Sequence, residues 1–232
     1  MTVTIRLACC ACWVWLGLAT LGFGGPAMAD GSADLALIEA AGRGDAAAVR
    51  KLLGDGASVA ARDRQGRTAL LAATHAPPGV GTEAARLLIA AGADVNAKDG
   101  IGDSPFLYAA AEGRNDILRM TLAAGADLKS TNRYGGTGLI PAAHHGHLET
   151  VRILLGTGVD KDHVNKLGWT ALLEAVILGD GGPVHTNIVR ELVAAGANVN
   201  IADRDGVTPL GHARKRGYAG MVRLLEEAGA RR

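Results

Sequence analysis

Residues 132–158 have the sequence NRYGGTGLIPAAHHGHLETVRILLGTG, and this stretch predicts one complete helix–turn–helix unit. A Gly–Gly turn leads into a short alanine-rich helix, and a Gly–His break separates it from a second helix. The second helix carries Val151, Leu154 and Leu155 on one face. Neither helix could bury its apolar face alone. We therefore expect similar units to pack on both sides of this one.

Glycines recur along the chain at a nearly constant spacing. One glycine precedes each first helix with spacings of 36, 33, 33 and 38, at Gly66, Gly102, Gly135, Gly168 and Gly206. Another closes each second helix with spacings of 36, 33, 33, 38 and 33, at Gly56, Gly92, Gly125, Gly158, Gly196 and Gly229. Both landmarks give a base period of 33 residues with insertions of 3 and 5 residues. Such a period predicts an array of helical repeats.

Three short motifs recur with this period. The first helices open with Thr68-Ala69-Leu70, Ser104-Pro105-Phe106, Thr170-Ala171-Leu172 and Thr208-Pro209-Leu210. A mid-unit break occurs at Gly146-His147, and units close with GADVN at 92–96 and GANVN at 196–200. These motifs resemble the Thr-Pro-Leu opening, the Gly-His break and the closing finger of ankyrin repeats. The resemblance covers about residues 34 to 230.

The resemblance implies an all-α fold, an ankyrin-repeat solenoid of about six helix–turn–helix repeats with short β-hairpin-like fingers. The approximate repeats are 33–62, 63–98, 99–131, 132–164, 165–202 and 203–232. The insertions at 75–81 and 179–185 both fall between the two helices of a repeat, so both should project from the same edge. Pro141 lies in the first turn of its helix and is expected to shift the start of that helix by a residue or two.

The first 29 residues have the pattern of a cleaved secretory signal peptide. Arg6 gives a positive start, the apolar run 7–23 carries no charge, and Ala27-Met28-Ala29 is a small-x-small cleavage site. The alternative is a transmembrane anchor, but the run is at the short limit for a bilayer span. We therefore predict a signal peptide at 1–29 and a repeat domain at 30–232. Resemblance to bacterial signal peptides and to secreted bacterial ankyrin proteins implies a periplasmic location.

Removal of residues 1–29 changes the composition of the chain. It removes all three cysteines, so neither disulfides nor thiol catalysis are expected in the domain. It also removes Arg6, which leaves 24 − 1 = 23 basic residues against 23 acidic residues. A balanced charge gives no reason to expect binding to nucleic acid, or stable insertion into a membrane once the signal is cleaved.

His144, His145 and His147 form the densest group of titratable residues. No Cys, Asp or Glu stands beside them at metal-ligand spacing, and His147 occupies the Gly-His position, where local hydrogen bonding is its usual role. We favour a structural or surface role over a metal-binding or catalytic role. The sequence therefore predicts no enzyme activity, no metal and no cofactor.

In ankyrin-like arrays, finger tips and the exposed ends of first helices form a concave surface that contacts partners. Five residues at these positions are apolar, namely Tyr134, Leu167, Trp169, Ile177 and Leu178, and four polar or basic residues surround them, namely Arg133, His144, His145 and Lys166. An apolar centre with a polar rim is typical of a protein interface. The alternative is that these apolar residues pack under adjacent fingers or against residues 179–185.

These observations predict a scaffold that binds a periplasmic partner protein through its concave face, centred on repeats four and five. Two other functions stay open. A small-molecule or cell-wall-fragment binding module would need a closed pocket, which the two insertions could roof. A hydrolase would use His144, His145 or His185. The repeat fold itself does not decide between them.

Overall fold

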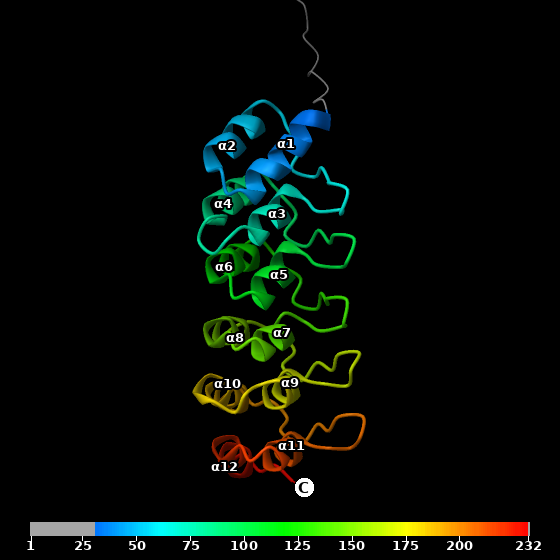
Figure 1. Cartoon of the computed structure of the whole chain (residues 1–232), viewed down its shortest axis with the longest axis vertical. Helices are drawn as coiled ribbons and strands as arrows, with labels where there is room; N and C mark the ends of the chain where they lie inside the picture. The colour runs from blue at the N-terminus through cyan, green and yellow to red at the C-terminus, as the bar shows by residue number, and fades with distance from the viewer. Residues whose placement is uncertain (1–30, 232) are drawn as a thin grey trace, which may run out of the picture.

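The computed structural model describes residues 31–231, so the predicted signal peptide at 1–29 lies outside the described residues. Within this range, twelve helices form six pairs stacked in one elongated column (Figure 1). The first helices are α1 (Gly31–Gly42), α3 (Ala69–His75), α5 (Pro105–Ala111), α7 (Leu139–His144), α9 (Ala171–Ile177) and α11 (Pro209–Lys215). The second helices are α2 (Ala46–Gly54), α4 (Thr82–Ala90), α6 (Asn115–Ala123), α8 (Leu148–Leu155), α10 (Pro183–Ala194) and α12 (Ala219–Glu227).

The loops that join one pair to the next project as fingers beyond the first-helix column (Figure 1). No β-strand forms within residues 31–231, so the hairpin-like fingers consist of turns. The predicted all-α solenoid of six helical pairs is confirmed. Over the same residues, no helix has the length and apolar character needed to cross a bilayer.

Most of the short first helices begin at a hydroxyl side chain. The Oγ of this residue accepts a hydrogen bond of 3.2–3.3 Å from the backbone N–H three residues later, at Thr68, Ser104, Thr170 and Thr208. This bond satisfies one of the amides that the first helical turn leaves unpaired. Pro105 and Pro209 stand at the first helical position, where a missing N–H costs least.

The fourth repeat departs from this pattern. Its helix α7 begins at Leu139, two residues after Thr137, whereas its counterparts begin one residue after the hydroxyl. Pro141 has no N–H, and the N–H of Ile140 donates to the Thr137 carbonyl at 3.1 Å. The Oγ1 of Thr137 is left buried without a hydrogen-bond partner in residues 31–231. The expected shift of the helix start is confirmed, and the hydroxyl no longer caps the helix.

Two threonine substitutions should therefore differ in their effect on stability. Thr170→Val removes a helix cap and should lower the free energy of unfolding by about 1 kcal/mol. Thr137→Val replaces a buried, unpaired hydroxyl by a methyl group and should be neutral or stabilising by up to about 1 kcal/mol. Urea unfolding of both variants gives the comparison. Equal losses would show that Thr137 caps α7 after all.

The apolar core is a continuous layer between successive repeats. Its large members include the third residue of each opening motif and the equivalent Leu139 of repeat four. These residues are almost completely buried: Leu70, Phe106, Leu139, Leu172 and Leu210. The principal helix contacts join each repeat only to its immediate neighbours, such as α5 to α3 and α7. The stability of such an array is approximately the sum of repeat and nearest-neighbour terms.

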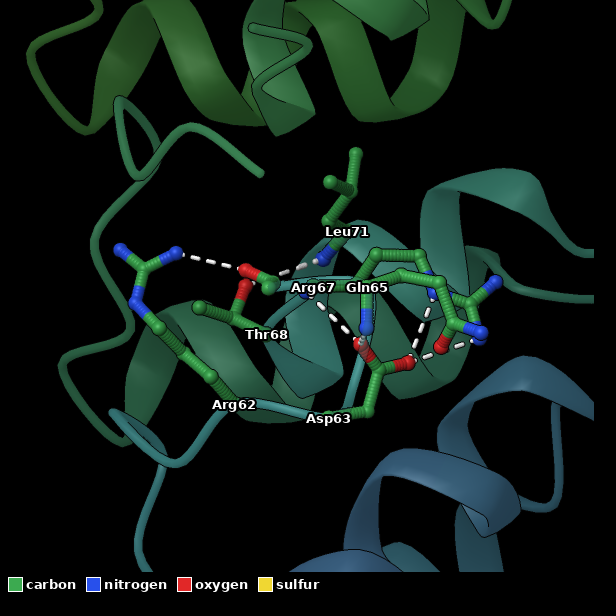
Figure 2. A network of polar contacts seen from close by, with 7 residues as sticks. Arg62, Asp63, Gln65, Arg67, Thr68 and Leu71 are labelled. Atoms are coloured by element: carbon green, nitrogen blue, oxygen red, sulfur yellow. Dashed lines mark hydrogen bonds and ion pairs between the residues drawn. The ribbon is translucent and has the colours of Figure 1, made fainter. Parts of the chain in front are cut away.

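Each finger is closed by one Asp or Asn side chain. Figure 2 shows the first finger, where Asp63 Oδ1 accepts 2.9 Å hydrogen bonds from the N–H groups of Gln65 and Arg67. The Oδ2 atom of Asp63 accepts from Arg67 Nε at 2.8 Å. The same two backbone bonds recur at Asp99, Asn132, Asn165 and Asp203. Five similar turns therefore present their tip residues at regular intervals.

The two insertions lie between the helices of repeats two and five, as predicted. Residues 76–81 connect α3 to α4, and residues 178–182 connect α9 to α10. The second loop is shorter than the expected 179–185, because Pro183 starts α10 and Val184 and His185 belong to its first turn. Proline at the first helical position explains the early start of this helix.

Candidate functional site

A groove of about 450 Å³ runs across repeats three to five on the finger side of the first helices. Its walls come from α5, α7 and α9 and from the fingers that precede these three helices. The apolar lining includes Leu107, Tyr108, Tyr134, Ile140, Leu167 and Leu178. The charged or titratable lining consists of Asp103, Glu112, Arg133, His144, His145 and Glu174. The groove thus combines an apolar surface with several polar groups.

Six of the nine predicted contact residues line this groove, namely Arg133, Tyr134, His144, His145, Leu167 and Leu178. Tyr134 is 54% exposed, Leu167 48% and Leu178 42%. The fingers and the end of α9 therefore bring together three apolar side chains that solvent can reach. The groove also extends to α5 in repeat three, one repeat beyond repeats four and five, on which the sequence analysis centred the surface.

The other three predicted residues do not line the groove. Lys166 joins two fingers, since its backbone N–H donates to the Tyr134 carbonyl at 2.9 Å and its Nζ to the Arg133 carbonyl at 3.1 Å. Trp169 and Ile177 are only partly exposed. Within the groove, the structure therefore places the predicted apolar surface on Tyr134, Leu167 and Leu178.

Arg133 is held on one wall by two neighbours. Its Nη1 lies 3.5 Å from Asp103 Oδ2, and its Cζ lies 5.0 Å from the centre of the Tyr134 ring. Partial burial raises the pKa of Asp103, while the Arg133 charge opposes that rise. The ion pair compensates the partly buried negative charge of Asp103. It also holds the Arg133 guanidinium beside the exposed ring of Tyr134.

Glu174 is a groove residue that the sequence analysis did not single out. It lies on α9, is 6% exposed, and its Oε1 accepts a 2.9 Å hydrogen bond from Asn165 Nδ2. The corresponding residues of repeat six, Asp203 and His212, are joined at 2.6 Å. The signal in the sequence is a single carboxylate within the apolar helix ALLEAVI at 171–177.

Burial has a strong effect on this carboxyl group. It raises the pKa of Glu174 to about 7, against the opposing hydrogen bond from Asn165 and the charge of His145. Its Oε2 lies 3.7 Å from His144 Nδ1. Burial also lowers the pKa of His144, and the charges of His145 and His185 lower it further. Glu174 therefore changes its charge near neutral pH, while His144 is mainly uncharged there.

The histidines connect neighbouring repeats at the ends of the first helices. His145 Nδ1 lies 2.7 Å from the Ala111 carbonyl and therefore donates to it. His185 Nε2 lies 3.0 Å from the His144 carbonyl, and its Nδ1 lies 3.0 Å from Asp180 Oδ1. These contacts support the structural role that we favoured. No group of three His, Cys, Asp or Glu side chains in residues 31–231 has the arrangement of a metal site.

The insertions do not roof the groove. Residues of the 76–81 loop line a separate cavity of about 490 Å³ together with α6 and His147. Leu178, the first residue of the 178–182 loop, lines the groove, whereas residues 179–185 of the predicted insertion do not. The expectation that both insertions could close over one pocket is therefore not met.

Comparison with known families agrees with this geometry. The family model described as "Ankyrin repeats (3 copies)" matches residues 106–203 and 142–231, and the one described as "Ankyrin repeat" matches residues 65–100. The chain belongs to the ankyrin repeat family. Its finger turns, hydroxyl caps and stacked helix pairs are therefore those of ankyrin repeats.

Similar proteins include the ankyrin repeat protein YahD of Escherichia coli (strain K12). YahD is 40% identical over 192 residues, which are 82% of this chain and 94% of YahD. An ankyrin repeat domain from Acinetobacter baumannii AYE is 57% identical with a TM-score of 0.80, and the match covers 84% of this chain and 98% of that chain. The ankyrin repeat protein EF0377 is 41% identical with a TM-score of 0.79, over 84% and 98% of the two chains.

Membership of the ankyrin repeat family limits the classes of function to consider. Ankyrin repeats generally mediate protein–protein interactions, and the ankyrin repeat family is typically non-enzymatic. In this chain, the groove on repeats three to five contains exposed apolar side chains.

Proposed function

We propose that the protein binds a partner protein through the groove over repeats three to five. The supporting observation is that Tyr134, Leu167 and Leu178, each more than 40% exposed, lie together on its walls. Polar residues including Glu112 and His145 surround them. A small apolar centre with a polar rim is the arrangement found at binding hot spots.

The fingers are already fixed in the free protein. The backbone N–H of Lys166 bonds to the Tyr134 carbonyl, and His163 Nε2 lies 2.7 Å from the Gly135 carbonyl. Arg204 donates to the Lys166 carbonyl. Because these bonds hold adjacent fingers in register, the groove loses little conformational entropy when a partner binds.

We also propose that the partner is periplasmic and that residues 1–29 direct export. The uncharged apolar run 7–23 and the Ala27-Met28-Ala29 site support this proposal. A fusion of residues 1–29 to a periplasm-dependent reporter tests it. Reporter activity with a mature N-terminus near Asp30 is expected, and an inactive fusion retained in the cytoplasm would contradict the export proposal.

The double substitution Tyr134→Ala with Leu167→Ala should abolish partner capture, because it removes the exposed apolar centre of the groove. Affinity purification from periplasmic extract with the purified protein, followed by titration of each recovered partner, measures this. The matched control is Val80→Ala with Val184→Ala, which removes two apolar side chains of similar exposure outside the groove.

The control variant is expected to retain every partner that the groove variant loses. Circular dichroism should be the same for the wild type and both variants, because all four residues are exposed at the surface. A partner bound equally by the wild type and the groove variant would place the interaction elsewhere and overturn the proposed site.

A further inference from the structure

The two carboxylate oxygens of Glu174 are in different environments. Oε1 accepts a 2.9 Å hydrogen bond from Asn165, whereas Oε2 accepts no hydrogen bond from residues 31–231. The titratable atom that lies within ion-pair distance of Oε2 is His144 Nδ1, at 3.7 Å. The Glu174 side chain is largely buried, but Oε2 is not among the fully enclosed unpaired atoms of residues 31–231, so solvent reaches it from the groove that Glu174 lines. An ionised Oε2 is therefore open to a positively charged group that enters the groove.

The charges of the groove leave this position negative. Arg133 pairs with Asp103 at 3.5 Å, while neither Glu112 nor Glu174 has a lysine or arginine within ion-pair distance among the described residues. His144 offers little compensation, since its pKa is lowered by burial and by two neighbouring histidines. The ionised groove thus presents two carboxylates without a cation.

The surroundings of Glu174 suit a long side chain with a positive end. Leu167 and Leu178 can cover an aliphatic stem, as apolar surfaces do for lysine and arginine. Tyr108 and Tyr134 line the same groove, and aromatic faces attract cations. The groove therefore offers apolar contact along the stem and negative charge at the end.

We propose that the groove binds a segment of the partner protein that inserts a lysine or arginine side chain, with its stem against Leu167 and Leu178 and its charged end on Glu174 Oε2. This inference rests on the proposed protein-binding function and adds the chemistry of the partner. It also gives the groove selectivity, because a neutral or acidic side chain would leave the carboxylate unpaired.

A library of random linear peptides displayed on phage, selected on the purified protein, tests this inference. Parallel selections use Glu174→Gln and the Tyr134→Ala, Leu167→Ala groove variant. The wild type is expected to select peptides that share one lysine or arginine between apolar residues. A synthetic peptide of this type should bind Glu174→Gln at least about tenfold more weakly, because its charge loses the carboxylate that the proposal assigns to it.

Replacement of the peptide's lysine or arginine by glutamine should cause a similar loss on the wild type. The same replacement should have little further effect on Glu174→Gln, because the two groups act as a pair. An equal loss on both proteins would mean that the cation contacts some other group and would overturn the role of Glu174.

The pH dependence of affinity is a second measurement. Binding of a cation needs ionised Glu174, whose pKa is about 7 in the free protein, so affinity should rise about tenfold from pH 6 to pH 8. Glu174→Gln should show no such rise. The titratable groups on the helices packed against α9 include His144 at the end of α7 and His145 directly after it, His185 on α10, and His212, paired with Asp203, on α11. All of these groups are present in both proteins.

Two other outcomes separate this inference from the proposed function. Peptides that require Tyr134 and Leu167 but share no lysine or arginine would leave groove binding intact and overturn the cationic partner. Peptides that bind all variants equally, or a failure to select any groove-dependent peptide, would count against both proposals.

Discussion

At pH 8, Glu174→Gln is expected to raise the free energy of unfolding by about 2 kcal/mol, and at pH 4 the difference should be close to zero. The folded-state pKa of Glu174 is about 7, above its ordinary value of 4.5. Below pH 4.5 the Glu174 carboxyl is mainly neutral in both the folded and the unfolded state, so its ionisation does not change the free energy of unfolding. As the pH rises from 4.5 to 7 the unfolded chain ionises first, so stability is lost, and above pH 7 the loss is constant. The expected difference of about 2 kcal/mol is smaller than the full pKa shift would give, because water in the open groove screens the Glu174 charge.

Urea unfolding at pH 4, 6 and 8, at constant ionic strength, measures this difference. Glu112→Gln is the matched control, since Glu112 is an exposed carboxylate on the same groove. The control should be within about 0.5 kcal/mol of the wild type at each pH. If Glu174→Gln were less stable than the wild type at pH 8, the ionised carboxylate would have to be stabilising, contrary to its burial.

Phe106→Ala is expected to lower the free energy of unfolding by about 4 kcal/mol. Phe106 is completely buried in the third repeat, where the other repeats that carry the motif have leucine. The neighbouring repeat packs closely here through Gly138, since a Cβ at that position would lie only 2.9 Å from Ala110 Cβ and in van der Waals contact, at 3.6 Å, with Phe106 Cζ. Removal of the ring would leave a cavity between repeats three and four that this tight interface cannot easily close.

The position of this cavity has a second effect. Weakening of one internal interface should uncouple the repeats on its two sides, because each repeat contacts only its neighbours. Trp169 fluorescence and circular dichroism should then give separate unfolding midpoints for Phe106→Ala. Phe106→Leu, which restores the usual residue, should cost about 1 kcal/mol and keep the midpoints together. A loss of about 1 kcal/mol for both variants would show that the interface adjusts around the cavity.

The fold could be predicted because the residues that recur with its period are those that the local backbone conformation requires. The glycines that precede the first helices all have left-handed backbone angles, for example φ 79° at Gly66 and 87° at Gly102. Side chains other than glycine rarely adopt this conformation, so the turn geometry appears directly as a sequence period. The threonine caps and the asparagine or aspartate turns are also local, because these side chains bond to backbone N–H groups within four residues of their own position.

The site could be predicted only in part, because exposure depends on neighbouring repeats. Tyr134, Leu167 and Leu178 can be identified from their positions in the repeat, at finger tips and at the end of a first helix, and all three line the groove. The bonds of Lys166 to the previous finger and the partial burial of Trp169 depend on how far one repeat turns relative to the next. Glu174 was missed because its environment is made by Asn165, nine residues away on the finger, and by His144 of the preceding repeat.

The finger turns also determine how this protein can be varied. In each turn, one Asp or Asn oxygen binds two backbone N–H groups, and no side chain between them takes part. Tip residues such as Tyr134 and Leu167 can therefore be exchanged without loss of the bonds that close the loop. A library randomised at the tips, with Asn132, Asn165 and the glycines fixed, would sample new binding specificities on an unchanged backbone. In evolution, the same separation lets recognition diverge while the scaffold is preserved.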